Sequence, residues 1–166
     1  MKRAQAANFD CKLIYSLGTS TRSLDEFINL LRRHSVTAVV DVRKLPNSRF
    51  EWFCEEKLAG LLDEAGIEYI SMGRELGGYR KGGYEAFTTT AEFQEAVGDL
   101  EKVALSKTVA IVCAERLPWR CHRRFIGFEL ERRGWQVVHI IEKKRYGSRE
   151  RLCRQSERCW ECRAIF

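Results

Sequence analysis

Short apolar runs alternate with amphipathic helical segments along residues 12–140, and this alternation constrains the fold more than any other feature of the chain. The run VTAVVDV at 36–42 is almost entirely apolar, which is typical of a strand buried on both faces of a parallel sheet. Further strands are expected at 12–17, 67–71, 108–113 and 135–140. The alternation predicts a three-layer α/β fold, with a mainly parallel five-stranded sheet and helices on both faces.

Helices are expected between these strands, where apolar side chains recur at helical spacing. Ser23 can cap the first helix, and Glu26 then completes a capping box. The predicted helices span 23–34, 55–66, 91–105 and 121–134. The segment 72–90, rich in glycine and aromatic residues, follows neither period, and long segments of this kind tend to be functional or mobile.

A length of 166 residues suits one domain. We therefore expect a single α/β domain over residues 1–141 and a basic, cysteine-containing tail over 142–166. No apolar run is long enough to cross a bilayer, and the first ten residues lack the apolar segment of a signal peptide. Seven cysteines without such a signal favour reduced thiols over a disulfide framework. These features predict a cytoplasmic protein with no membrane partner.

Polar, glycine and arginine residues follow four of the expected strands. In parallel sheets, ligands bind beyond the carboxyl ends of the strands, so these residues form one candidate site. Arginine side chains and backbone N–H groups before a helix both suit phosphate and carboxylate, which predicts an anionic ligand bearing a phosphate or a nucleotide. The candidate ligand-binding residues are Gly18, Ser20, Arg22, Arg43, Gly77, Gly78, Arg120, Cys121 and Arg123.

The segment CAERLPWRCHRR at 113–124 supplies most of the candidate chemistry. Cys113 stands at a strand end beside arginines, which favours a lowered pKa and a role as nucleophile or sulfur carrier. His122 is a candidate proton donor, and Glu115 and Asp41 are candidate acids or bases. Alternatives stay open: the two carboxylates also suit ion pairs with arginines, and His122 also suits a plain surface position. Cys121 aligns with two phenylalanines of the following helix, as a buried-face residue would.

Two enzyme classes invite comparison with this segment. Cys113 and Arg120 are separated by six residues, one more than in the phosphate cradle of cysteine phosphatases. A rhodanese-type sulfurtransferase is a closer analogy, because VVDVR at 39–43 is similar to the Asp-Val-Arg strand of such domains. The residues do not decide between an enzyme, a binding protein and a purely structural role for the cysteines, and they name no cofactor.

The C-terminal segment suggests an alternative function. Residues 142–163 contain eight basic and four acidic side chains, which could hold nucleic acid by phosphate contacts or form a solvated tail. Trp119, Tyr79 and Tyr84 are candidate stacking residues for bases. The tail also contains Cys153, Cys159 and Cys162, which could bind zinc if another segment supplied a fourth ligand, and which otherwise are free thiols.

The order of these motifs resembles the family catalogued as domain of unknown function 488. The similarity covers roughly residues 13–141 and is carried by the segment 18–49, ELGG at 75–78, CAERLPWRCHR at 113–123 and VVHI at 137–140. The resemblance implies an α/β domain and no established activity. The family motif residues carried over to this chain are Gly18, Ser20, Arg22, Asp41, Arg43, Pro46, Glu75, Leu76, Gly77, Gly78, Cys113, Glu115, Cys121, His122 and Arg123.

Overall fold

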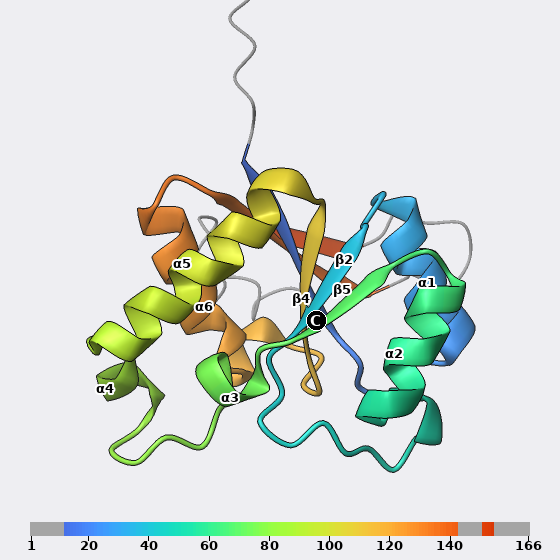
Figure 1. Cartoon of the computed structure of the whole chain (residues 1–166), viewed down its shortest axis with the longest axis horizontal. Helices are drawn as coiled ribbons and strands as arrows, with labels where there is room; N and C mark the ends of the chain where they lie inside the picture. Colours follow the sequence, from blue (N-terminus) through green and yellow to red (C-terminus); the bar gives the residue numbers. More distant parts are fainter. Residues whose placement is uncertain (1–11, 143–150, 155–166) are drawn as a thin grey trace, which may run out of the picture.

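A six-stranded sheet forms the middle layer of the computed structural model, which describes residues 12–142 and 151–154 (Figure 1). Its order is β3-β2-β4-β1-β5-β6, and the five strands β1 to β5 run parallel, as the sequence predicts. The strands are β1 Leu13–Gly18, β2 Ala38–Asp41, β3 Glu68–Ser71, β4 Val109–Cys113, β5 Gln136–Glu142 and β6 Arg151–Arg154.

The helices cover both faces of this sheet, as expected (Figure 1). One face carries α1 Leu24–Arg33 and α2 Glu55–Glu64, and the other carries α3 Gly73–Leu76, α4 Tyr84–Thr88, α5 Ala91–Ser106 and α6 Arg123–Arg132. Two short 3-10 helices, η1 Glu51–Phe53 and η2 Pro118–Arg120, lie in the connections. No helix in the described ranges is long and apolar enough to span a membrane.

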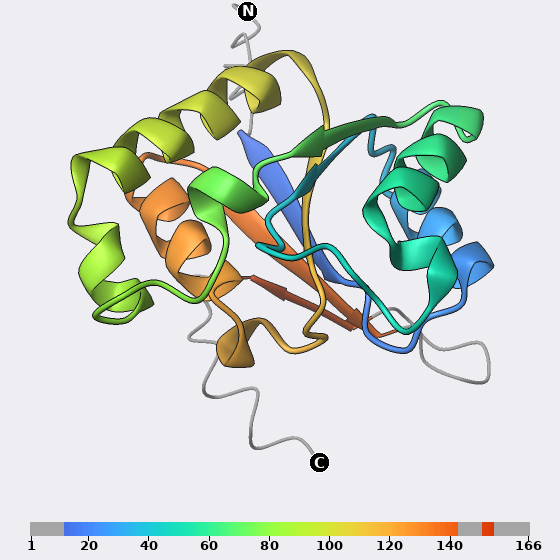
Figure 2. The ribbon, with the colours of Figure 1, turned by 60° about the horizontal axis from the view of Figure 1, so that its bottom comes forward.

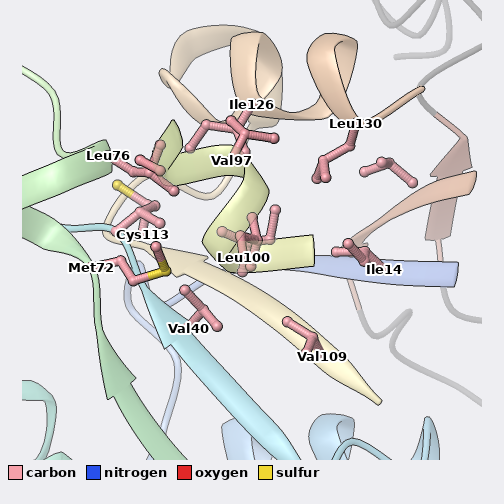
Figure 3. Packing of buried hydrophobic residues seen from close by; sticks show 14 of the residues in the cluster. Ile14, Val40, Met72, Leu76, Val97, Leu100, Val109, Cys113, Ile126 and Leu130 are labelled. Carbon is pink, nitrogen blue, oxygen red and sulfur yellow. The ribbon is translucent and has the colours of Figure 1, made fainter. Parts of the chain in front are cut away.

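Each face of the sheet has its own apolar cluster, because successive strand residues point to opposite faces. On β2, Val39 packs with α1 and α2, whereas Val40 packs with the cluster of α5 and α6. Figure 3 shows the second cluster, in which Val40 and Leu100 lie with Cys113. Cys113 is therefore both the last residue of the buried strand β4 and a member of this apolar cluster.

Helix α1 begins with the predicted Ser23 cap, but within the described residues Glu26 does not complete the predicted capping box, because its carboxylate binds Arg22. The Ser23 hydroxyl accepts a hydrogen bond from the backbone N–H of Glu26 (3.1 Å), which satisfies one of the free donors of the first turn. The Glu26 carboxylate binds the guanidinium of Arg22 at 2.6 Å. The cap thus also anchors the arginine that precedes the helix.

The segment 72–90 differs from its prediction, because it contains the short helices α3 and α4. Helices of one turn are too short to show an apolar period, which is why the sequence gives no sign of them. Helix α3 lies against the chain after β2, and a Cβ added at Gly73 would lie 1.9 Å from the carbonyl oxygen of Arg43. Only glycine permits this approach, so α3 closes tightly over the end of β2.

Strand β6 is a second feature that the sequence does not predict. It pairs antiparallel with β5, with His139 opposite Cys153 in the register. The pairing is irregular between Ile140 and Glu142. The sheet therefore extends into the segment that follows residue 142.

Candidate functional site

The carboxyl ends of β1, β2 and β4 meet at one edge of the sheet. Gly18 is in register with Cys113, and the Thr19 N–H donates to the Cys113 carbonyl (2.8 Å). The Val42 N–H donates in the same way to Val112 (2.9 Å). Figure 2 turns the lower side of the molecule forward and shows the loop after β2 passing next to α3. Residues far apart in sequence are thereby fixed around one opening.

A cavity of about 680 Å³ opens at this edge. Several predicted site residues line it, namely Arg43, Gly78, Cys113, Glu115, Arg120, Cys121 and His122. The cavity also has lining residues that we did not predict for the anion site, namely Lys44, Leu45, Asn47, Tyr79, Tyr84 and Ala114. The shared edge confirms that the segments after β2 and β4 converge.

Other predicted site residues do not line this cavity. They are Gly18, Ser20, Arg22, Asp41, Gly77 and Arg123. Three of them, Arg22, Asp41 and Arg123, instead make hydrogen bonds or ion pairs that hold the edge of the sheet together.

Arg22 is 1% exposed and binds the chain on both sides of it. Its Nε donates to the carbonyl of Gly18 (2.9 Å) and its Nη2 to the carbonyl of Ile141 (2.5 Å). Together with the Glu26 ion pair, these bonds use all three guanidinium nitrogens. Arg22 therefore links the ends of β1 and β5, and each of its three guanidinium nitrogens already has a protein partner.

Arg43 and Asp41 form a buried ion pair. The guanidinium donates to both carboxylate oxygens through Nε, and its Nη2 lies 2.5 Å from Asp41 Oδ2. Asp41 also accepts from the Tyr69 hydroxyl (2.8 Å), while Arg43 Nη1 donates to the Phe53 carbonyl (2.7 Å). Both carboxylate oxygens of Asp41 are occupied, so Asp41 orients Arg43 at the cavity wall instead of facing a ligand.

Arg123 is 1% exposed and does not line the cavity. It donates to the Ser16 hydroxyl (2.7 Å) and to the carbonyl of Glu115. Its Nε is a buried donor with no partner in the described part of the chain. The three family-motif arginines thus hold the framework, and the exposed Arg120, which is outside the motif set, is the predicted arginine left for a ligand.

The motif glycines allow close packing. A Cβ at Gly18 would lie 2.2 Å from the Glu115 carbonyl oxygen, and one at Gly77 would lie 2.7 Å from Lys44 Cβ. A Cβ at Gly78 would lie 3.2 Å from His122 Nδ1, so this glycine backs the imidazole. Gly18 and Gly77 therefore allow neighbouring segments to pack closely at this edge of the sheet, and Gly78 leaves room for the His122 imidazole.

Cys113, Cys121 and His122 meet at the cavity. One ligand-type atom from each side chain lies within 4.8 Å of the others. Cys121 Sγ and His122 Nδ1 are 3.7 Å apart, and His122 Nε2 is 3.0 Å from the carbonyl oxygen of Val42. A carbonyl only accepts, so Nε2 carries a proton and donates, which turns Nδ1 toward the sulfur. Tyr84 packs on the same imidazole, with ring centroids 5.0 Å apart.

The pKa values of the two thiols are shifted in the opposite sense to the expected one, with Cys121 lowered and Cys113 raised. A hydrogen bond from Cys113 lowers the pKa of Cys121, and contacts with His122 and Arg123 act in the same direction against the effect of burial. The same hydrogen bond, together with burial, raises the pKa of Cys113. The prediction of a lowered Cys113 pKa is therefore wrong, because it considered arginine charge and overlooked the neighbouring thiol.

Cys121 precedes α6, and its side chain is buried at the cavity floor. Cys121 is buried in the same apolar cluster as Ile126 and Leu130 of α6, as the helix-face alternative expects, whereas Phe128 of the same pattern is 49% exposed. Trp119, a candidate stacking residue, is buried with Ile141. Tyr79 is 90% exposed at the cavity mouth.

Two predictions concern the C-terminal segment. Of its cysteines, Cys153 lies in β6, whereas Cys159 and Cys162 lie outside the described residues. The zinc site and the nucleic-acid alternative for this segment therefore stay predictions.

Comparison with known proteins gives one match. A family model described as "Domain of unknown function DUF488" matches residues 23–83 and 80–128. These ranges include the loop after β2, the ELGG motif and the segment that carries both cavity cysteines. No curated protein and no solved structure matches the chain.

Proposed function

The chain belongs to the DUF488 family, whose description assigns no activity, and we propose that it binds a small anionic molecule in the cavity and acts on it through the Cys121 thiolate. The observation that carries this proposal is the meeting of Cys113, Cys121 and His122 at the floor of a cavity with cationic side chains. A nucleophile, a proton carrier and an anion-binding group are the parts that such chemistry needs.

The cationic groups favour an anionic ligand. Arg120 is exposed and lines the cavity, and its guanidinium has no hydrogen-bond or ion-pair partner in the described ranges. Lys44, also exposed, donates to the Tyr79 carbonyl (3.1 Å) and keeps further N–H donors for a ligand. Phosphate, carboxylate and sulfur oxyanions all bind such groups.

Cys121 is the better nucleophile of the pair. Its sulfur lies 3.7 Å from Nδ1 of His122, which is placed to take its proton, and the neighbouring Cys113 thiol lowers its pKa. In a sulfur-carrier version, the thiolate attacks the outer sulfur of a thiosulfate-like anion. The sulfur–sulfur bond of the donor breaks, sulfite leaves with its electron pair, and Cys121 holds a persulfide. Cys113 then stands beside the modified sulfur as a hydrogen-bond donor.

Alkylation with a charged and an uncharged reagent tests the proposal. Reduced, EDTA-treated full-length protein is labelled with iodoacetate or iodoacetamide, and modified cysteines are located by peptide mapping. We expect Cys121 to be labelled first and to show a higher iodoacetate-to-iodoacetamide rate ratio than Cys54. In Arg120→Gln the ratio should fall about fivefold, since one charge near 4 Å in water contributes about 1 kcal/mol.

Lys102→Gln is the matched control, because Lys102 is an exposed cation on α5 outside the cavity. It should leave the ratio unchanged. A Cys121 ratio that equals that of Cys54, or that does not respond to Arg120→Gln, contradicts anion binding. Incubation with thiosulfate then tests the sulfur-carrier version, which requires a gain of one sulfur atom on the Cys121 peptide.

A further inference from the structure

We propose that Cys113, Cys121 and His122 bind one Zn²⁺ ion, with the fourth coordination position open to the cavity, and that bound zinc blocks the thiol chemistry of the same residues. The blocking effect rests on the proposed function, whereas the metal site does not. Nothing in the family description refers to a metal.

The donor set is the first support. Two thiols and one imidazole place their ligand atoms within 4.8 Å of one another, in the one such group found within residues 12–142 and 151–154. Thiolate and imidazole donors favour Zn²⁺ over the hard cations Mg²⁺ and Ca²⁺. Small movements would bring the three atoms to the spacing that a tetrahedral ion requires.

The orientation of His122 is the second support. Its Nε2 donates to the Val42 carbonyl, which leaves the lone pair of Nδ1 directed toward Cys121. Histidines that bind metals almost always donate their other ring N–H to a carboxylate or carbonyl, which fixes tautomer and ring angle. Gly78 and Tyr84 hold the ring from its sides, so the donor is in place before the ion arrives.

Charge and burial are the third support. Cys113 and Cys121 are each at most 8% exposed, and such burial disfavours two free thiolates. A zinc ion bound to two thiolates and a neutral imidazole forms a group with no net charge. Binding releases the thiol protons to solvent and changes no oxidation state. The unpartnered Nε–H of Arg123 remains as a buried donor beneath the site.

The fourth position follows from the cavity. All three ligand residues line the cavity, and three protein ligands with one open position is the pattern of exchangeable and catalytic zinc sites. Structural zinc sites have four protein ligands instead. We therefore expect an ion that chelators remove without unfolding the chain. While it is bound, both sulfurs are engaged and alkylating reagents cannot react with them.

The test uses full-length protein in which Cys153, Cys159 and Cys162 are serine, so that tail thiols do not contribute. Metal-free, reduced protein is titrated with Zn²⁺ against a chromophoric chelator, and separately with Co²⁺ to record its absorption. We expect one equivalent of zinc, and a Co²⁺ spectrum with thiolate charge-transfer bands and the visible bands of tetrahedral coordination. Adding Cys113→Ser, Cys121→Ser or His122→Ala should weaken zinc binding by about 100-fold or more.

Cys54→Ser is the matched control and should bind zinc normally, because Cys54 lies at the start of α2 outside the cavity. The absence of zinc binding in the tail-serine protein, or unchanged affinity in His122→Ala, overturns the metal site. Zinc binding that leaves Cys121 alkylation unchanged overturns the blocking effect. Charge-selective alkylation is measured on EDTA-treated protein, so a failure of the anion proposal is seen independently of zinc.

Discussion

The imidazole of His122 hydrogen-bonds through Nε2 to the carbonyl oxygen of Val42, 80 residues earlier in the chain, at 3.0 Å. This bond joins the residue that follows β2 to the residue that precedes α6. It fixes which nitrogen of His122 faces Cys121. The reactivity of the cysteine segment therefore depends on a loop from another part of the sequence.

Gly78→Ala should disturb His122 without unfolding the chain. The new Cβ would lie 3.2 Å from Nδ1, so the imidazole must shift by a few tenths of an ångström. We expect zinc affinity to fall about tenfold, as with other changes to groups that support a metal ligand, and the melting temperature to stay close to wild type. Competition titration and thermal unfolding measure the two effects.

Gly60→Ala is the control, because a Cβ there meets nothing within 4 Å. It should leave zinc affinity unchanged and slightly raise stability, since alanine favours a helix over glycine. Equal zinc affinities in the two variants would show that Gly78 does not support the imidazole.

Asp41→Asn should mainly reduce stability. It leaves the buried guanidinium of Arg43 without its charged partner, and breaking one side of a buried ion pair costs about 3–5 kcal/mol. Tyr69→Phe removes a single neutral donor to the same carboxylate and should cost only about 1 kcal/mol. Urea unfolding gives both values, and a loss below about 1 kcal/mol for Asp41→Asn would contradict the framework role.

Substitution of Arg123 should reduce stability much more than substitution of Arg120, although the two residues lie three positions apart. Arg123→Met leaves the buried Ser16 hydroxyl and the half-buried Glu115 carbonyl without their donor, and we expect a loss of about 2 kcal/mol or more in the free energy of unfolding. Arg120→Met changes an exposed side chain and should stay within about 0.5 kcal/mol. Chemical denaturation of the pair separates a framework arginine from a ligand-binding one, and similar losses would contradict this division.

The Glu129 carboxylate should contribute to stability at neutral pH and lose this contribution in acid. Hydrogen bonds and charge from Arg132 and Arg133 lower the pKa of Glu129 to about 2. Its carboxylate therefore stabilises the fold fully above the unfolded pKa of about 4.3, and the effect disappears as the pH falls toward 2. Glu129→Gln should accordingly be less stable than wild type at neutral pH, and the gap should narrow below about pH 4.

Urea unfolding at several pH values measures this gap. Glu95→Gln, at an exposed position of α5, serves as the control with little effect at any pH. A constant difference between wild type and Glu129→Gln down to about pH 2 would contradict the linkage.

Sequence patterns predict the layers, the five parallel strands and the edge where the site lies, because burial and helical spacing are local and periodic. They do not predict how each arginine is used. Arg43 and Arg120 look equivalent in sequence, but one is bound to Asp41 and the other is exposed. The pairing of Cys113 with Cys121 depends on the path of the connection through η2, which has no period. Lys44 also lines the cavity, and its position directly after Arg43 at a strand end is the sequence feature that could have predicted this.

Each buried arginine at this edge binds at least one main-chain carbonyl in addition to its side-chain partner. Arg22 donates to the carbonyls of Gly18 and Ile141, Arg43 to that of Phe53, and Arg123 to that of Glu115. Main-chain carbonyls are present whatever side chain a residue carries. The side chains that line the cavity can therefore change during evolution while these main-chain contacts are kept. Relatives of this protein could recognise different ligands on one unchanged frame.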